Sequence, residues 1–485
     1  MPIFLILGVP VILAAGVFFF KKLKIFAVVN AGGYLGIFLL SGTLLSKMVL
    51  SKSTFAFFGF IYVDILSAFF IFVISAVTFA TALYSIDYIE KDIKNEVISQ
   101  RKARIYYALF NLFCFSMFFV PAVNNLGMLW VAIEMTTLIS AFLVGFYNTK
   151  ESVEAAWKYI IICSVGIIFA LLGTILFSYA FSLSEGMRSL NWTDMMAASS
   201  RLDTNIIKIA FIFILVGYGT KAGLAPMHTW LPDAHSQAVA PISALLSGVL
   251  LKTAIYAILR FGLIVIGGAG LSYFCHLMIF FGVISLVISC GFIIVQKDIK
   301  RLLAYSSIEH VGIIAIGFGL GTPLGWMGAL LHVFNHAVTK SLMFFGAGDI
   351  VSVYKEHAMS NIRGVTKTMP FVGTLVLLGV FALTGFPPFS IFISEILIII
   401  AAFVKGSYLV AALLLLFLVV IFGAFIYHFA EMLFGNLPKN MTATKEPLSA
   451  KGAFLFLFVL MCATGVVLPF IKEDMLWVVQ TLLPH

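Results

Sequence analysis

The sequence predicts an all-α polytopic membrane protein with about fourteen transmembrane helices, and two observations carry this prediction. First, 62% of the 485 residues are hydrophobic and only 11% are charged, which is more apolar surface than a soluble fold buries. Second, the apolar residues gather into fourteen stretches, each close to or above the roughly 20 residues that a membrane helix needs. The connections are too short to hold a soluble domain.

The predicted helices follow one another from the first residues to the last. Met1 is followed directly by apolar sequence, without the basic segment of a cleaved signal, so we expect the first helix to remain as an anchor. The fourteen stretches are 3–20, 25–45, 58–82, 106–121, 123–147, 155–182, 206–229, 240–266, 271–294, 301–320, 323–347, 369–404, 407–434 and 452–470.

Basic residues predict the orientation in the membrane. Connections alternate between two faces, and 18 of the 30 Lys and Arg residues fall on one of them, Lys300, Lys439 and Lys445 included. Eight, among them Arg260, fall on the face that holds both termini, and four lie within the stretches. Because cytoplasmic connections are enriched in Lys and Arg, we expect both termini to face outward. The net charge of +9 then reflects topology and indicates no nucleic-acid partner.

Cofactor motifs are absent from the sequence. The five cysteines all lie in apolar stretches without a CxxC pair, which excludes an iron–sulfur or zinc site of the usual spacing. Glycine-rich nucleotide motifs are missing too. We therefore expect no metal, redox cofactor or catalytic residue in this chain, and the energy for any coupled process would come from a partner.

Two stretches look interrupted, which is typical of transporters. Glycine and proline meet at Gly223 and Pro226 in the seventh stretch, and at Gly385 and Pro387 in the twelfth. Such interruptions in corresponding halves indicate an inverted repeat, while ordinary proline kinks are the alternative. The predicted organisation is helices 1–3 (1–105), a first unit of helices 4–8 (106–268), a second unit of helices 9–13 (269–436) and helix 14 (437–485).

Seven titratable residues lie deep in apolar stretches. Charges there cost a few kcal/mol, and they commonly serve proton or cation transport. Glu134 and Lys221 form the natural pair, with Lys252 as the next group; a static buried ion pair is the alternative. The seven are Glu134, Lys221, Lys252, His310, His332, His336 and Lys340.

Three of these residues form a row on one helix. His332, His336 and Lys340 recur every four residues, so they share one face over about 12 Å. Histidine suits proton transfer because its ordinary pKa is near neutral, and His310, preceded by Glu309, would join the row at its centre. Hydrogen-bonded core histidines are one alternative. A metal site is another, but the sequence offers no HExxH pattern and no third acidic ligand beside them.

Other polar residues lie at the ends of this row. Glu395 follows the twelfth stretch's interruption and would exchange protons with the outer face, unless it is simply solvated near the interface. Lys158 opens the sixth stretch. His228, Asp233 and His235 lie in the connection that begins at Pro226, where they form either an entrance funnel or ordinary loop polarity.

These motifs resemble a known family over residues 60–435. The segments Lys221-Ala-Gly-Leu-Ala-Pro-Met-His-Thr-Trp-Leu-Pro-Asp-Ala-His235 and Asp298-Ile-Lys-Arg-Leu-Leu-Ala-Tyr-Ser-Ser-Ile-Glu-His310 are similar to motifs of the antiporter-like subunits of respiratory complex I and Mrp-type antiporters. Glu134 after Leu129-Trp130, the stretch Glu154–Tyr159 and His336-Ala-Val-Thr-Lys340 add to the resemblance.

The resemblance implies fourteen spans, two inverted five-helix units and proton translocation along a central polar axis. By position, Glu134 and Lys221 would be the coupling pair and Lys252 and His310 the central relay. The row 332–340 would continue the path to Glu395 as the exit. A carboxylate at the exit resembles the M-type subunit of complex I and hydrogenase homologues. The end of the chain after the fourteenth span argues against the L-type.

Several details resemble the F component of hydrogenase-4 and related membrane-bound [NiFe]-hydrogenase or formate hydrogenlyase complexes. These are Ser-Ile-Glu309-His310, Ala155-Ala-Trp157-Lys158-Tyr159 and Gly385-Phe-Pro-Pro-Phe. The alternatives are an M-type NADH–quinone oxidoreductase subunit, an Mrp-type sodium/proton antiporter subunit, and a scaffold subunit that transports nothing.

Partners and location follow from the same resemblance. We expect other membrane subunits, a peripheral redox arm that carries iron–sulfur clusters and a NiFe centre, and a prokaryotic inner (cytoplasmic) membrane.

Overall fold

The computed structural model describes residues 2–437, 441–444 and 446–483, and it is almost entirely helical. Every apolar stretch of the sequence contains a helix or a pair of helices. The long helices are α1 (Pro2–Gly16), α2 (Leu23–Ser51), α3 (Ile65–Lys94), α4 (Gln100–Phe119), α5 (Leu126–Val144), α6 (Lys150–Glu185), α8 (Thr204–Ala222), α11 (Leu251–Ala269), α12 (Leu271–Val295), α13 (Ile299–Gly319), α14 (Pro323–Tyr354), α16 (Pro370–Leu383), α17 (Ser390–Val404), α18 (Tyr408–Phe434) and α19 (Leu448–Leu482).

Shorter elements connect these helices. One hairpin pairs two antiparallel strands with Phe55 opposite Val63. The short elements are α7 (Trp192–Ala197), α9 (Trp230–Gln237), α10 (Ala240–Leu245), α15 (Val365–Thr368), β1 (Phe55–Phe57), β2 (Ile61–Val63), three 3₁₀ turns (Val120–Ala122, Ser199–Arg201 and Met359–Asn361) and a π-helical turn (Leu246–Leu250).

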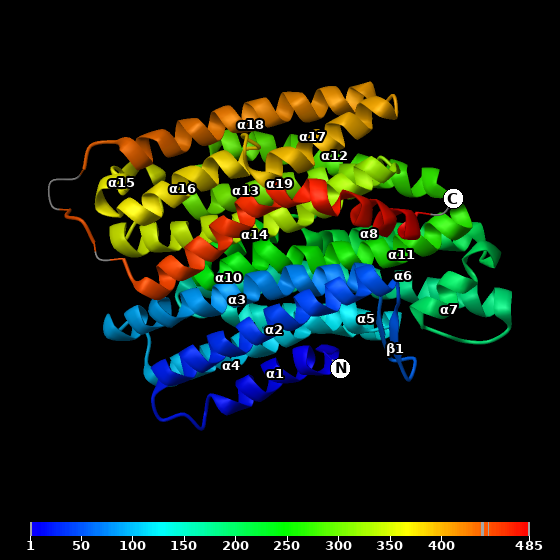
Figure 1. The fold of residues 1–485 in the computed structure, drawn as a ribbon, viewed down its shortest axis with the longest axis horizontal. Coiled ribbons are helices and arrows are strands. Elements are labelled where there is room, and N and C mark those ends of the chain that lie inside the picture. Colours follow the sequence, from blue (N-terminus) through cyan, green and yellow to red (C-terminus); the bar gives the residue numbers. More distant parts are fainter. Residues whose placement is uncertain (1, 438–440, 445, 484–485) are drawn as a thin grey trace.

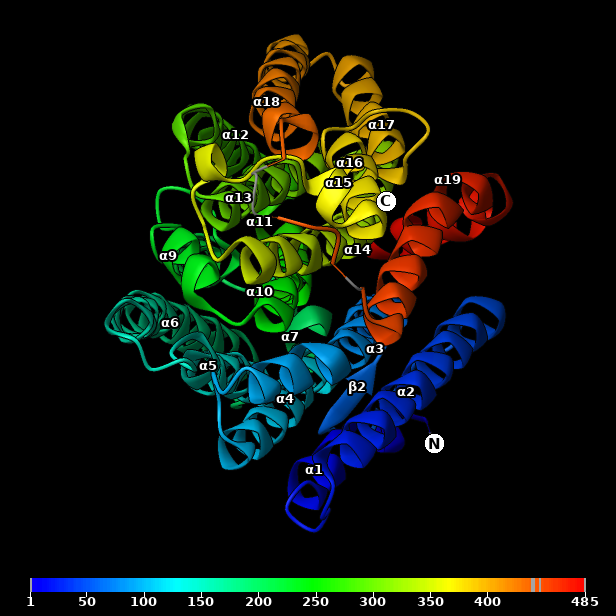
Figure 2. The same ribbon diagram turned by 90° about the vertical axis from the view of Figure 1, so that its left-hand side faces the viewer.

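Helices run side by side along one direction (Figure 1), with α3, α11 and α14 inside the bundle (Figure 2). Among the described residues, ten helices are long and apolar enough to cross a membrane, counting α10 with α11, and four shorter apolar helices accompany them. The chain is thus a multi-pass membrane protein. Figure 1 also shows that α1 begins and α19 ends at the same end of the bundle, as an even number of crossings requires.

Side-chain caps begin several helices where the sequence turns polar. The side chains of Asp64, Asn125 and Asp298 accept backbone N–H groups at the first turns of α3, α5 and α13. For Asp298, burial acts to raise the carboxyl pKa, but a hydrogen bond from His357 and the capped N–H of Arg301 hold it below 3.8.

The chain leaves the helix at both predicted interruptions. α8 ends at Ala222, where Gly223 adopts φ +80°, and α9 begins only at Trp230. α16 ends at Leu383 and α17 begins at Ser390, with Gly385 at φ +66° between them. Each interruption contains one cis peptide bond, before Pro226 and before Pro388.

One basic residue lies elsewhere than the charge pattern placed it, and another lies where it was placed but is buried. Arg260 was assigned to an outer connection, but it lies inside α11 with 3% of its surface exposed. Lys300 is buried in the first turn of α13, where its Nζ donates to the Ala238 carbonyl over 3.0 Å. A basic residue that binds a partner inside the protein gives no information about which face of the membrane is cytoplasmic. Arg260 and Lys300 therefore do not belong in the count of basic residues on each face. Lys439 and Lys445, which the count also used, lie outside the described residues.

Candidate functional site

Lys221 is completely buried in the last turn of α8. Its Nζ donates to Thr137 Oγ1 over 2.9 Å and to the Tyr159 hydroxyl over 2.5 Å. The rings of Tyr159 and Trp230 lie 4.6 and 5.9 Å from the ammonium, which adds cation–π attraction. Close packing of α8 on α6 sets this position, since a Cβ at Gly217 would lie 2.5 Å from the Ala170 nitrogen.

Glu134 lies near Lys221 but does not form an ion pair with it. Its Oε1 accepts from Ser164 over 3.2 Å, while Oε2 is buried without a hydrogen-bond partner. The two predicted partners are instead connected through α5, because Thr137, one turn after Glu134, accepts from Lys221. The alternative of a static buried ion pair is therefore not what the structure shows, because hydroxyl groups hold the lysine.

A π-helical turn carries Lys252 toward the second cluster. The turn precedes the buried Lys252, whose Nζ donates to the Ser247 carbonyl over 2.5 Å and contacts His336 Nδ1 at 2.6 Å. A π turn contains one residue more than an α turn and leaves carbonyls free for side chains. The contact joins α11 to α14.

Three histidines gather around this contact. The ring centroids of His310 and His336 lie 4.6 Å apart, and those of His310 and His332 lie 5.1 Å apart. His310 comes from α13, whereas the other two lie one turn apart on α14. All three are completely buried.

Hydrogen-bond donors fix an order within the cluster. The Ser394 hydroxyl donates to the Ile391 carbonyl over 2.8 Å, so its oxygen accepts from His332 Nδ1 over 3.0 Å. With both rings neutral, His332 Nε2 then accepts from His310 Nδ1 over 2.9 Å. The chain runs from His310 to His332 to Ser394 and ends on a backbone carbonyl.

Lys340 and Glu309 extend the buried row along α14 and α13. Lys340 Nζ donates to the Leu303 carbonyl over 2.7 Å and to Ser306 Oγ. Glu309 is 2% exposed and forms no ion pair with Lys340. Both titratable groups are therefore held by helix packing and neutral partners.

Glu395 lies against the twelfth stretch's interruption. It is 4% exposed, so solvation near the interface is excluded, and one Oε atom has no partner. Ligand atoms of His310, His332 and Glu395 lie within 4.8 Å of one another. The statement that no acidic ligand accompanies the histidines was thus wrong, because Glu395 reaches them from a helix distant in sequence.

The residues of the α8–α10 connection divide into two groups. His235 is buried and stacks on Phe344 with ring centroids 4.8 Å apart, and His228 is also buried, which excludes loop polarity for both. Burial, together with Lys340, Lys300 and Lys252, holds the pKa of His235 well below 6.5. Asp233 instead joins a surface network.

Lys158 lies at the surface, outside the buried row. About half of its side chain is exposed, and its Nζ pairs with Glu154 at 2.8 Å and with Asp233 at 3.2 Å. Asp233 also contacts Arg301 at 3.0 Å. The sequence placed Lys158 within a span, and the structure places it in the third turn of α6 with its side chain at the surface.

The buried groups form two clusters in one row. The first surrounds Lys221 between α5, α6 and α8, and the second contains Lys252, the three histidines, Lys340 and Glu395 between α11, α13, α14 and α17. Among the described residues, no hydrogen bond joins the two clusters.

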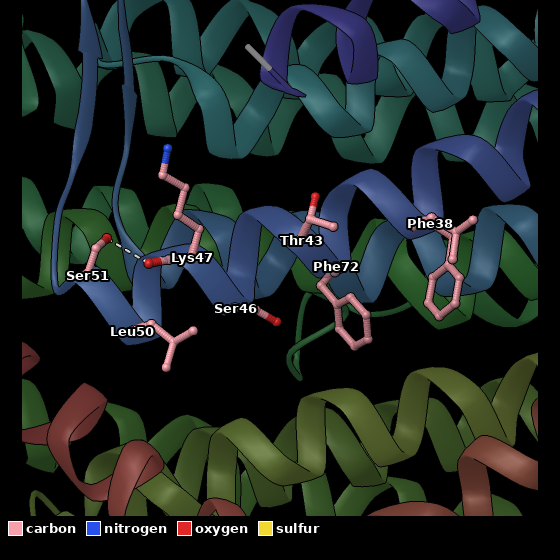
Figure 3. Close-up of a pocket in the computed structure, with 9 residues that line it drawn as sticks. Phe38, Thr43, Ser46, Lys47, Leu50, Ser51 and Phe72 are labelled. Atoms are coloured by element: carbon pink, nitrogen blue, oxygen red, sulfur yellow. Dashed lines mark hydrogen bonds between the residues drawn. The ribbon is translucent and has the colours of Figure 1, made fainter.

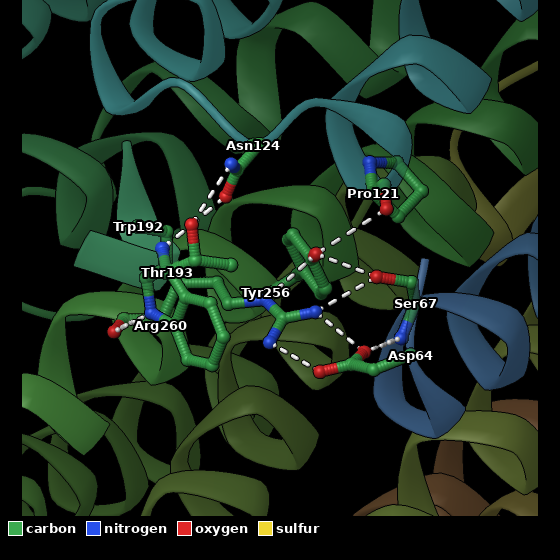
Figure 4. A network of polar contacts seen from close by, with 8 residues as sticks. All are labelled: Asp64, Ser67, Pro121, Asn124, Trp192, Thr193, Tyr256 and Arg260. Atoms are coloured by element: carbon green, nitrogen blue, oxygen red, sulfur yellow. Dashed lines mark hydrogen bonds and ion pairs between the residues drawn. The ribbon is translucent and has the colours of Figure 1, made fainter. Parts of the chain in front are cut away.

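A buried arginine network escaped the sequence analysis. Arg260 donates to both Asp64 oxygens over 2.7 and 2.6 Å, and further to Ser67 and the Tyr256 hydroxyl (Figure 4). Trp192 covers the guanidinium at 4.4 Å. The sequence does contain a signal for this network: the acid Asp64 lies inside one apolar stretch, and the base Arg260 lies inside another, far along the chain.

A surface hollow of about 590 Å³ lies apart from the buried row, along α2 and α3 (Figure 3). Its walls are mostly apolar, with Phe38, Leu50 and Phe72 among them, and Lys47 at one end. No titratable residue of the row lines it. The hollow therefore does not belong to the candidate site.

Apolar helices that enclose a row of lysines, histidines and carboxylates define an antiporter-like membrane subunit. The chain belongs to the family described as "NADH:quinone oxidoreductase/Mrp antiporter, TM", which matches residues 123–426. The family predicted from the sequence is thereby confirmed.

Curated relatives agree with this assignment. The hydrogenase-4 component F homolog of Methylacidiphilum infernorum is 39% identical over 85% of this chain and 86% of the relative. Hydrogenase-4 component B of Escherichia coli K12 is 32% identical over 68% of this chain, which spans 49% of that relative.

Solved structures share the fold. A chain of the membrane-bound sulfane sulfur reductase, an archaeal respiratory membrane complex, superposes with a TM-score of 0.85 at 25% identity over 99% of this chain and 97% of that one. A chain of respiratory complex I from Thermus thermophilus gives 0.81 at 21% identity over 100% of both chains, which shows the fold alone.

Proposed function

We propose that this chain translocates protons, or another cation, as a membrane subunit of a redox-driven complex of the hydrogenase-4 or formate hydrogenlyase type. One observation carries the proposal: lysines 221, 252 and 340 and three histidines lie completely buried inside the bundle. Buried bases without carboxylate partners are costly, so their retention indicates a use. The similarity to hydrogenase-4 component F favours this type of complex.

In the proposed mechanism, a redox step in partner subunits changes the charge or hydration near Glu134. That change shifts Lys221, which is held only by hydroxyl groups and aromatic rings. A proton then passes to Lys252, on to His336 across their 2.6 Å contact, and through the histidine cluster to Glu395. Water must bridge the step from the first cluster to the second, because no hydrogen bond among the described residues spans it. Lys340 and Glu309 adjust the charge beside the path.

Partner subunits would supply the chemistry that this chain lacks. We place the iron–sulfur clusters and the NiFe centre in a peripheral arm and in neighbouring subunits, and no redox cofactor here. One relative is named as a homolog of a hydrogenase-4 component, and one similar structure is that of an archaeal respiratory membrane complex. We infer that this chain likewise contacts other membrane subunits in a prokaryotic inner membrane.

The finer architecture is also a proposal. We infer fourteen spans, with two inverted five-helix units at 106–268 and 269–436. Each unit contains one interrupted helix with a left-handed glycine, Gly223 or Gly385, which supports the pairing of the units. Both termini face outward.

Replacement of the coupling groups tests the proposal in the native complex. In Lys221→Ala and Glu134→Ala variants, we expect proton pumping to fall at least tenfold while electron transfer and assembly continue. Lys208→Ala, in the same helix as Lys221 but partly exposed, is the matched control and should pump normally. Normal pumping by both Lys221→Ala and Glu134→Ala would contradict the relay.

The type of complex has its own test. Purification of the native complex should yield nickel and iron together with hydrogen turnover. Quinone-linked NADH oxidation without nickel would instead indicate an M-type subunit. Sodium/proton exchange in vesicles without either redox activity would indicate a component of an antiporter. The relative that represents this outcome is the D component of the Na(+)/H(+) antiporter of Alkalihalophilus pseudofirmus, 29% identical over 66% of this chain and 64% of the relative.

A further inference from the structure

We propose that His310, His332 and Glu395 form a binding site for a divalent transition-metal ion of the zinc class. The three side chains come from α13, α14 and α17 and converge at the centre of the second cluster. Their ligand atoms lie within 4.8 Å of one another. Two imidazoles and one carboxylate are a set that zinc uses when a fourth position stays open.

The spacing of the two histidine nitrogens suits a small ion. Two nitrogens at 2.0–2.1 Å from a tetrahedral ion lie roughly 3.3 Å apart. His310 Nδ1 and His332 Nε2 are already 2.9 Å apart, so the ion would replace their hydrogen bond after a small separation of the rings. The proton of that bond would move to the outer nitrogen of His310, Nε2.

An unpartnered carboxylate oxygen supports the same site. Glu395 Oε1 is buried without a hydrogen-bond partner. Buried polar atoms rarely stay unpaired without a reason. Ion binding would supply the Glu395 carboxylate with a cation.

Ser394 supplies the outer support that metal-bound histidines usually have. It accepts from His332 Nδ1, which leaves the Nε2 lone pair directed toward His310 and the centre of the site. The same serine is anchored to the Ile391 carbonyl. His332 is therefore held in the tautomer that a metal requires.

An access route runs through the interruption between α16 and α17. Phe386, Pro387 and Pro388 are exposed, and Gly385 next to them packs directly on the Glu395 carboxylate. The exposed turn is a short path by which an ion reaches Glu395.

Occupancy would block proton transfer, because the ion takes the lone pairs of His310 and His332. This consequence rests on the proposed function, whereas binding itself does not. Zinc at the site should inhibit translocation, and a chelator should restore it. Binding without inhibition would retain the metal site and reject the relay through it.

Zinc binding to the purified, untagged complex tests the site directly. Equilibrium dialysis should show one zinc ion per copy of this chain, and zinc K-edge spectroscopy should show two histidine nitrogens and a carboxylate oxygen. Glu395→Gln and His332→Asn should each weaken binding at least tenfold. His276→Gln, an exposed histidine on α12, is the control and should bind like the parent.

Three results would overturn the proposal. They are no stoichiometric zinc in the parent complex, equal affinity in Glu395→Gln and the parent, or loss of binding in His276→Gln. If either site variant fails to assemble, the zinc K-edge spectrum of the parent complex tests the site instead. A spectrum that shows fewer than two histidine nitrogens around the zinc would also reject the site.

Discussion

Gly385 is the residue where the interruption of the twelfth stretch touches the buried row. Its φ of +66° is a conformation that side chains rarely adopt, and an added Cβ would overlap Glu395 Oε2. A larger residue must therefore both strain the turn and push the carboxylate away from His310 and His332.

We expect Gly385→Ala to reduce ion translocation at least tenfold. The left-handed backbone costs about 1–2 kcal/mol with any side chain, so a control must carry the same strain. Gly406→Ala provides it, because Gly406 has φ +76° and open space around its Cα. Proton flux in vesicles should be lost in the first variant and kept in the second; equal flux in both would show that Glu395's position is irrelevant.

Single residues show what the sequence could predict at this scale. Six of the seven deep titratable residues are completely buried, because apolar flanks on both sides of a charge leave it no route to water. The Tyr159 and Thr137 hydroxyls that hold the Lys221 ammonium could not be predicted, because hydroxyls on neighbouring helices give no sequence signal. Glu395's approach to His332 likewise depends on how α14 and α17 pack.

At the scale of elements, α3 and α11 are joined by the Asp64–Arg260 pair. The two side chains meet in a bidentate arrangement with 4% of the arginine and 11% of the aspartate side chain exposed. Trp192 and Tyr256 enclose it. This pair connects the N-terminal helices to the centre of the bundle.

Removal of one partner should destabilise the fold strongly. Asp64→Asn leaves the Arg260 charge buried without a counter-charge, which costs about 3–5 kcal/mol in comparable cases. We expect a lower thermal midpoint, with part of the loss recovered in the double variant Asp64→Leu, Arg260→Met. Arg201→Met removes an exposed pair with Glu185 and should shift the midpoint far less. Equal shifts would mean that burial does not strengthen the pair.

Element boundaries were predictable where local chemistry sets them. Glycine and proline predicted both interruptions, since they lack the side chain or the N–H that a continuous helix needs. The π turn at Leu246–Leu250 contains only one such residue, Gly248, so the sequence does not predict it. A Cβ added at Gly248 would lie 2.7 Å from Ser341 Oγ. The turn is set by contact with α14, which lies far along the chain.

At the scale of the whole molecule, one end of the bundle carries both the start of α1 and the end of α19 (Figure 1). Exposed apolar side chains, such as Leu409 and Val419 of α18, cover the flanks. These flanks suit lipid or neighbouring subunits. Charge asymmetry between the two ends remains the basis for orientation.

Labelling with a membrane-impermeant maleimide tests that orientation. Arg188→Cys, at the end with the termini, should react in intact cells, while Lys355→Cys, at the opposite end, should react only in inside-out vesicles. The native cysteines give a low background because four of the five are buried. The reversed pattern would place both termini in the cytoplasm.

The order of hydrogen bonds from His310 through His332 to Ser394 has a kinetic consequence. A proton that leaves by way of His332 reverses each bond behind it, and the Ser394 hydroxyl, fixed on the Ile391 carbonyl, does not pass it on. Each transfer must therefore be followed by rotation of rings back to the starting order. Where that reset limits turnover, replacing exchangeable hydrogen with deuterium would slow translocation only slightly.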